Sequence, residues 1–189
     1  MDYIKKHKQA LNDLVETLQR LDPVIENVEL AGNEIISALK ENRKVLTAGN
    51  GGSAADALHL VEELVGRFEK KRSPFPAICL AADPTLITCI SNDYGFDSIF
   101  TRQVEALAWP GDVLVIFTTS GNSVNLNLAL DKAKEKGVKT IALIGKNGGI
   151  SKGKADFEVI VPSNDTAHIQ EVHTFILHCW LRQIESVLC

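Results

Sequence analysis

The chain has 189 residues, of which 45% are hydrophobic and 23% are charged, and its formal net charge is −4. This length and composition predict one soluble globular domain with a core of its own. The negative charge argues against a general nucleic-acid or anionic-membrane binder, and no apolar run approaches the ~20 residues that span a bilayer. Residues 1–7 are not followed by the apolar segment of a secretory signal, so we expect a cytoplasmic protein.

The four cysteines, Cys79, Cys89, Cys179 and Cys189, show no C-x-x-C spacing. Cys79 and Cys89 lie in apolar stretches of sequence, where a free cysteine usually acts as a small buried hydrophobe. A disulfide framework is therefore not expected.

Two helices are expected before any strand. Residues 2–20 have an amphipathic pattern, and Asp22-Pro23 then breaks the first helix and starts a second over residues 23–41. Two such helices cannot easily bury both apolar stripes against one face of a sheet. We therefore favour an oligomerisation role for residues 1–41, as a helical bundle between subunits, with packing inside one chain as the alternative. The apolar positions of the first helix are Ile4, Leu11, Leu14, Leu18 and Leu21.

From residue 44 the pattern alternates between strands and helices, which predicts a doubly wound α/β core over residues 44–189 within a single domain, 1–189. Ligands of such folds bind at the carboxyl ends of the strands. The sequence also predicts a turn at residues 92–95. The expected strands are 44–48, 77–81, 112–118, 140–144 and 157–161, and the expected helices are 53–68, 84–91, 98–108, 125–136 and 168–188.

A small-residue turn follows the first expected strand. Gly49, Gly51 and Gly52 allow positive φ and a close approach to a ligand. Ser53 is a natural N-cap, so the turn is expected to end at a helix N-terminus that faces an anion. One turn further, His59 and Glu63 are four positions apart and share one helical face, a spacing that suits a metal site or an acid–base pair.

A second polar turn lies at residues 118–123, after the apolar strand at 112–118. Four hydroxyl side chains and one glycine precede a helix here, which predicts a nest for a single phosphate on a small molecule. The alternative is a loop that only caps its helix. Neither a nucleotide P-loop nor a dinucleotide fingerprint is present. One pocket would collect this loop, residues 50–53 and residues 92–93.

The last expected helix contains Gln170, His173 and His178. Taken alone, these histidines are more often packing or surface residues. Combined with His59 and Glu63, they offer a site of nitrogen and oxygen donors, which favours zinc or a similar divalent ion.

Five short motifs occur together: Asn50-Gly51-Gly52-Ser53-Ala54-Ala55-Asp56-Ala57-x-His59, Glu63-x-x-Gly66-Arg67, Asn92-Asp93, Thr119-Ser120-Gly121-Asn122-Ser123 and Ile169-Gln170-Glu171-x-His173. In this combination the chain resembles the sugar isomerase (SIS) domain family over nearly its whole length. More narrowly, it is similar to the phosphoheptose isomerases, which act on sedoheptulose 7-phosphate.

The resemblance implies a flavodoxin-like five-stranded core and a homotetramer whose active sites are shared between neighbouring subunits. It implies one zinc ion per subunit, held by His59, Glu63, Gln170 and His178. By the same resemblance the 118–123 loop holds phosphate, while residues 50–53 and 92–93 hold sugar hydroxyls. The implied substrate-binding residues are Asn50, Gly51, Gly52, Ser53, Glu63, Asn92, Asp93, Thr118, Thr119, Ser120, Ser123 and Gln170.

The expected reaction interconverts a ketose and an aldose through an enediol, with Glu63 as the base and His178 as the acid. The alternatives are an isomerase for another sugar phosphate and a non-catalytic SIS protein, either a sugar-phosphate sensor or an adaptor for a replication initiator. The sequence departs from the family pattern at two positions. His168 stands where many relatives have arginine, and Thr118 stands where serine is common.

Overall fold

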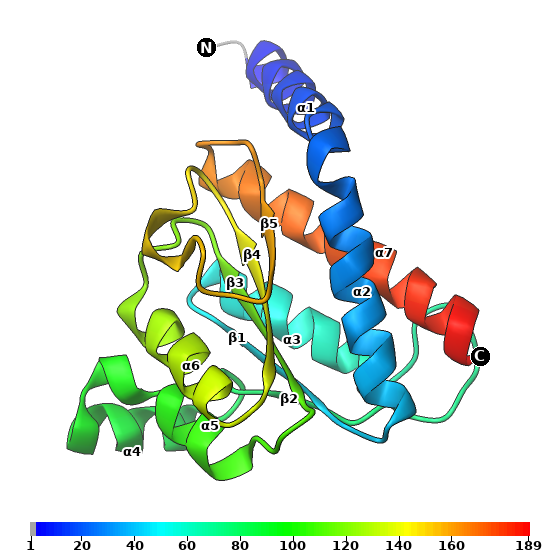
Figure 1. Cartoon of the computed structure of the whole chain (residues 1–189). Coiled ribbons are helices and arrows are strands. Elements are labelled where there is room, and N and C mark those ends of the chain that lie inside the picture. Colours follow the sequence, from blue (N-terminus) through cyan, green and yellow to red (C-terminus); the bar gives the residue numbers. More distant parts are fainter. Residues whose placement is uncertain (1–2) are drawn as a thin grey trace.

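The computed structural model describes residues 3–189. Five strands of this described chain form one parallel sheet in the order β2-β1-β3-β4-β5 (Figure 1). β2 and β3 flank β1 on opposite sides, so the direction of winding changes there and leaves a crevice at the carboxyl end of β1. The doubly wound, flavodoxin-like prediction is confirmed. The strands are β1 Val45–Gly49, β2 Ala77–Cys79, β3 Val113–Thr118, β4 Lys139–Ile144 and β5 Phe157–Ile160.

Helices cover both faces of the sheet, because alternate residues of the central strands point to opposite sides. Val115 and Phe117 of β3 face one core, while Leu114 and Ile116 face the other. The first core is closed by α2 (Ile25–Lys40), α3 (Gly52–Val65) and α7 (Thr166–Leu188). The second is closed by α4 (Pro84–Tyr94), α5 (Thr101–Leu107) and α6 (Val124–Glu135).

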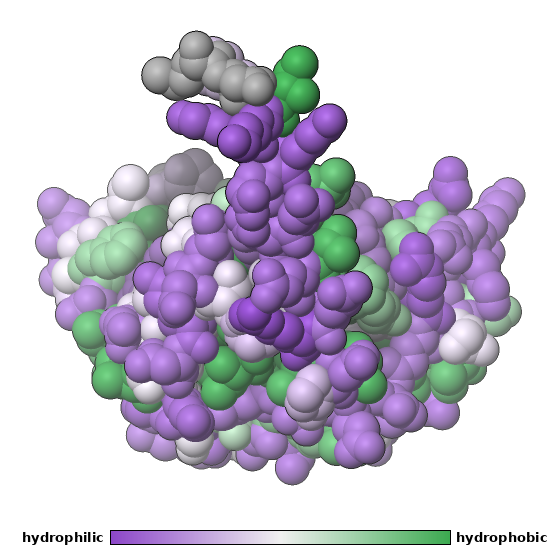
Figure 2. Space-filling model, turned by 90° about the horizontal axis from the view of Figure 1, so that it is seen from above, coloured by the Kyte–Doolittle hydropathy of each residue, from purple (hydrophilic) through white to green (hydrophobic). Residues whose placement is uncertain are grey.

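The two N-terminal helices behave differently. α2 buries its apolar stripe inside the chain, including Val28 and Ile35. α1 (Tyr3–Gln19) rises away from the body, and Figures 1 and 2 show it as a projecting column. Only its last turns, at Leu14 and Leu18, pack against the core. The predicted start of this helix, at residue 2, lies outside the described residues.

Several predicted boundaries move by a few residues. Pro23 lies in a 3-10 turn, Asp22–Val24, that precedes α2. A second 3-10 turn, Phe96–Ser98, replaces the start of the helix expected at residue 98. The turn expected at residues 92–95 is wrong, because α4 continues through Tyr94 and ends only where Gly95 takes a φ of 85°. A positive φ at glycine is a usual way to end a helix.

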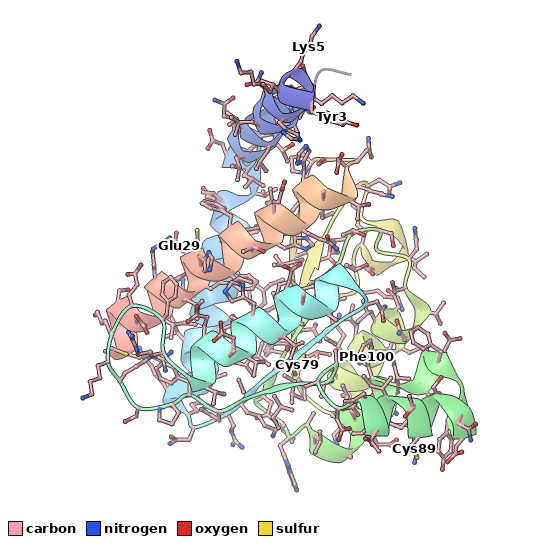
Figure 3. The ribbon with its side chains drawn as sticks, turned by 180° about the vertical axis from the view of Figure 1, so that it is seen from behind. Tyr3, Lys5, Glu29, Cys79, Cys89 and Phe100 are labelled. Carbon is pink, nitrogen blue, oxygen red and sulfur yellow. The ribbon has the colours of Figure 1, made fainter. Side chains whose placement is uncertain are left out.

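All four cysteines are free in the described chain. Cys79 is buried, as predicted, but Cys89 is exposed, and Figure 3 labels both. The prediction for Cys89 is wrong because α4 buries only Ile90 against the core. Cys89 is the residue before Ile90 and therefore points about 100° away from it around the helix. Among the described helices, none is long and apolar enough to cross a membrane.

Candidate functional site

The turn between β1 and α3 brings backbone amides to the carboxyl edge of the sheet. The predicted N-cap role of Ser53 is wrong: Gly51, with a φ of 57°, occupies the N-cap, and no side-chain cap bond forms there within residues 3–189. The first helical residue, Gly52, lies against the side-chain amide of Gln170, where any Cβ would overlap it. Ser53 is buried in the first turn of α3. The N-terminus of α3 therefore stays free of a side-chain cap.

The loop between β3 and α6 forms the neighbouring wall. Gly121 has a φ of 68°, and its amide donates to the Thr118 hydroxyl at 3.1 Å. Ser151 braces the loop by donating its hydroxyl to the Gly121 carbonyl at 2.8 Å. Ser123 occupies the N-cap of α6, yet its hydroxyl makes no capping bond among the described residues. A role limited to helix capping is thus not supported for this loop.

A cavity of about 110 Å³ lies between these two turns. Its walls combine predicted residues of both turns with two apolar side chains of the core. Since the N-termini of α3 and α6 converge here, the cavity offers hydroxyls and backbone amides to an anion. The lining residues are Asn50, Ser53, Phe117, Thr118, Thr119, Ser120, Ser123 and Leu126.

Asn125 links the two turns and was not predicted as a site residue. Its side-chain amide and that of Asn50 exchange two hydrogen bonds, each 3.0 Å long. Asn125 is buried at the start of α6. Its only sequence signal was a polar residue in the first turn of a helix that follows a hydroxyl-rich loop. The pair holds the Asn50 side chain at the cavity wall.

Asn92 and Asp93 do not line this cavity. Both lie in the last turn of α4, where the Asn92 amide donates to Asp93 at 2.8 Å. Asp93 borders a separate hollow of about 390 Å³ between α4 and α5, together with Tyr94 and Arg102. Within one chain, the structure therefore brings together the two turns but not this third predicted element.

Three predicted ligands meet between α3 and α7. His59, Glu63 and His178 each place one ligand atom within 4.8 Å of the others. Nε2 of His59 lies 3.7 Å from a Glu63 carboxylate oxygen, and the two imidazole rings are 5.0 Å apart, edge to face. Two imidazole nitrogens and one carboxylate form a donor set that suits zinc. The fourth predicted ligand, Gln170, lies on α7 against Gly52.

The surroundings of the cluster shift its proton affinities. Burial raises the pKa of Glu63, the neighbouring Glu62 charge adds to this, and His59 partly opposes it. Burial lowers the pKa of His178, and the charges of His59 and Arg182 lower it further. Phe68 stacks on the His178 ring at 5.5 Å. Near neutral pH, His178 is therefore neutral, the form that binds a metal.

His173, the other predicted histidine of α7, is fully buried against the sheet. Its ring lies edge-on to Phe117 at 6.0 Å, and neither nitrogen makes a well-formed hydrogen bond within the described chain. Burial lowers its pKa to about 3, and the Ile144 carbonyl opposes this only in part. His173 is a core residue and lies outside the metal cluster.

Comparison with known proteins identifies the family of the chain. Residues 2–145 match the SIS domain family. The phosphoheptose isomerase of Citrifermentans bemidjiense is 52% identical over 186 residues, which cover 98% of this chain and 95% of that protein. The solved structure of a phosphoheptose isomerase from Francisella tularensis superposes with a TM-score of 0.94 at 35% identity, covering 98% of this chain and all of that one. The corresponding structure from Neisseria gonorrhoeae gives a TM-score of 0.91, also at 35% identity, over 97% of this chain and 99% of that one. The chain belongs to the phosphoheptose isomerase family of SIS-domain proteins.

Proposed function

We propose that this protein is an aldose–ketose isomerase that converts sedoheptulose 7-phosphate to D-glycero-D-manno-heptose 7-phosphate, the first step towards a nucleotide-activated heptose. One observation carries the proposal: the His59, Glu63 and His178 cluster lies on two helices, α3 and α7. Near their N-terminal ends, Gly52 and Gln170 of these helices contact each other beside the hydroxyl-lined cavity. A phosphate cavity and an acid–base cluster thus share α3 as a common wall. The names of the relatives support the same activity.

The substrate phosphate would sit in the cavity at the β3–α6 loop. Thr119, Ser120 and Ser123 supply hydroxyls there, and the N-terminus of α6 supplies backbone amides and a favourable dipole. Because Asn50 and Ser53 form the opposite wall, they would face the sugar hydroxyls. In this proposal the sugar chain would extend along α3, towards Glu63.

The reaction moves one proton between carbons and one between oxygens. Glu63 would take a proton from C1 of the ketose while the C2 carbonyl oxygen gains one, which gives an enediol. Glu63 then returns its proton to C2 as the C1 hydroxyl loses its own. The raised pKa of Glu63 makes it a stronger base than an ordinary carboxylate, and His178 would exchange the oxygen-bound protons.

Zinc, one ion per subunit, is the proposed cofactor. His59, Glu63 and His178 would hold it with Gln170, and the bound ion would polarise the substrate carbonyl as a Lewis acid. A carboxylate that holds a metal is a weaker base, so Glu63 serves the two roles at different moments.

A homotetramer in the cytoplasm is the proposed assembly and location. Two features support an active site completed by a neighbouring subunit. The apolar side chains Tyr3, Ile4 and Leu11 are 60–69% exposed on α1. Asn92 and Asp93 lie outside the cavity of their own chain.

Turnover of sedoheptulose 7-phosphate tests the proposal. The purified protein with zinc is expected to form the aldose, and chelator treatment is expected to abolish this until zinc is restored. The Glu63→Gln variant, with its fold checked by circular dichroism, should lose at least 10²-fold in kcat. Binding of the sugar phosphate without conversion, in the presence of metal, would instead establish a non-catalytic regulator or adaptor.

A further inference from the structure

α3 and α7 lie side by side on one face of the sheet, and Figure 3 shows the two helices next to each other, running in a similar direction. Each helix carries part of the metal cluster, with His59 and Glu63 on α3 and His178 on α7. The distance between the ligand atoms is therefore set by how the two helices are held. Two polar contacts hold them, each made by a buried carboxylate, and they are here named the Asp56–Thr174 clamp and the Arg72–Glu185 clamp.

The Asp56–Thr174 clamp joins the two helices on the N-terminal side of the metal cluster. The Thr174 hydroxyl donates to Oδ1 of Asp56 at 3.0 Å, and Asp56 is only 7% exposed. Its other oxygen, Oδ2, is buried without a hydrogen-bond partner among residues 3–189. Asp56 precedes His59 by three positions, and Thr174 precedes His178 by four. The clamp therefore lies one helical turn from a ligand on each helix.

The Arg72–Glu185 clamp joins α7 to the segment that follows α3. The two side chains form an ion pair at 2.9 Å and are 4% and 3% exposed. The same carboxylate accepts the backbone amides of Phe68, Glu69 and Lys70 at 2.9–3.3 Å. One segment of chain is thus tied to a single buried carboxylate.

This second clamp reaches the ligand residues through the backbone. The Arg72 guanidinium donates to the carbonyl of Glu63 at 2.6 Å and to that of Leu64 at 2.9 Å. The segment bound by Glu185 also carries Phe68, whose ring stacks on His178. The clamp consequently fixes the last turn of α3 and one wall of the imidazole pocket.

Apolar contacts between helices tolerate small sliding movements, whereas a buried hydrogen bond has a narrow range of length and direction. We propose that the Asp56–Thr174 and Arg72–Glu185 clamps are positioning devices that set the register of α3 against α7 and thereby the metal affinity of the cluster. The inference rests on the proposed metal site. Groups that orient metal ligands typically change metal affinity 10–100-fold when they are removed.

Competition for zinc against a chromophoric chelator tests this proposal with a readout other than activity. Thr174→Val keeps the shape of the side chain but removes the hydroxyl, and we expect it to weaken zinc binding about 10–100-fold. Thr174→Ser, which keeps the hydroxyl, should restore binding. Glu185→Gln should weaken binding to a similar degree. With cobalt as the probe ion, both weakened variants should show an altered visible spectrum.

Two control variants separate positioning from general effects. Glu69→Gln removes an ion pair to Arg182 between the same two elements, where both side chains are more than half exposed, and it should leave zinc affinity unchanged. Leu130→Ala weakens the core on the opposite face of the sheet and should lower stability without lowering zinc affinity.

Four outcomes decide the proposal. A folded Thr174→Val protein with the wild-type zinc affinity would overturn it, as would an equal loss in Leu130→Ala. If Glu185→Gln fails to fold, the Thr174 pair of variants decides alone. If the wild-type protein binds neither zinc nor cobalt, the metal site itself is refuted and the clamp proposal is refuted with it.

Discussion

His173 and His178 lie five positions apart on α7 and have opposite environments. His178 is partly exposed between α3 and the Phe68 ring, whereas His173 is fully buried against β3. Five positions turn a helix by about 140°, so the two rings leave opposite sides of α7. The same residue type therefore serves as a candidate ligand on one side and as core packing on the other.

The buried His173 predicts an acid-sensitive fold. Its pKa is about 3 in the folded chain and 6.5 when exposed, so between these values the unfolded chain binds the extra proton. Stability then falls as pH drops through this window, by about 1.4 kcal/mol per pH unit. Between pH 7 and pH 5 the loss from this residue is about 2 kcal/mol.

Urea unfolding at pH 7 and pH 5 measures this loss, and His173→Met should remove it. His168→Gln is the matched control, because the hydrogen bond to Glu171 raises the pKa of His168. A raised pKa stabilises the fold at low pH, so this control should keep a loss at least as large as that of the wild type. Equal pH dependence in wild type and His173→Met would contradict the assignment.

At the scale of elements, the β3–α6 loop depends on one glycine. Gly121 has a φ of 68°, and a Cβ there would overlap the carbonyl of Gly148 in the β4–β5 connection. Both the conformation and the contact exclude a side chain. The cavity between the two turns, the proposed phosphate site, consequently requires two connecting loops to remain in contact.

Gly121→Ala should therefore destabilise the fold by more than about 3 kcal/mol, since left-handed strain and overpacking add. It should also raise the KM for the sugar phosphate at least tenfold. Gly153→Ala is the control, because Gly153 has a φ of 83° but no atom within 4 Å of its would-be Cβ. That control should cost only about 1–2 kcal/mol and leave KM unchanged. Similar effects in both variants would show that the loop contact is unimportant.

Local patterns predicted most elements and part of the site. Periodicity located the five strands, and the spacing of His59 and Glu63 placed both on one face of α3. Tertiary detail was out of reach: which histidine of α7 faces α3 depends on how the helices cross, and Asn125 is buried only because two loops converge. The N-cap prediction for Ser53 is wrong because Gly51, with its positive φ, takes the N-cap position. α3 therefore begins at Gly52, one residue before the expected start at residue 53.

At the scale of the whole molecule, α1 is the helix that leaves most of its apolar face uncovered. Its apolar face, formed by Tyr3, Ile4, Leu11 and Val15, is 44–69% exposed and extends beyond the body of the chain. Figure 2 shows hydrophobic groups along one flank of this column. A second copy of the chain is the proposed cover, because burial of apolar area of this kind drives association of subunits.

Leu11→Glu combined with Val15→Glu should shift the protein to smaller species, measured by light scattering coupled to size-exclusion chromatography. Two buried carboxylates would lose their hydration at the interface, and this cost is large when no partner is available. Gln9→Lys is the control, since Gln9 lies about 160° around α1 from Leu11 and is exposed. If α1 forms the contact, the double variant dissociates, but each subunit stays folded and still unfolds cooperatively in urea. The control keeps the wild-type mass. An unchanged mass in the double variant would place the subunit contacts elsewhere and leave the exposed face of α1 without a role in assembly.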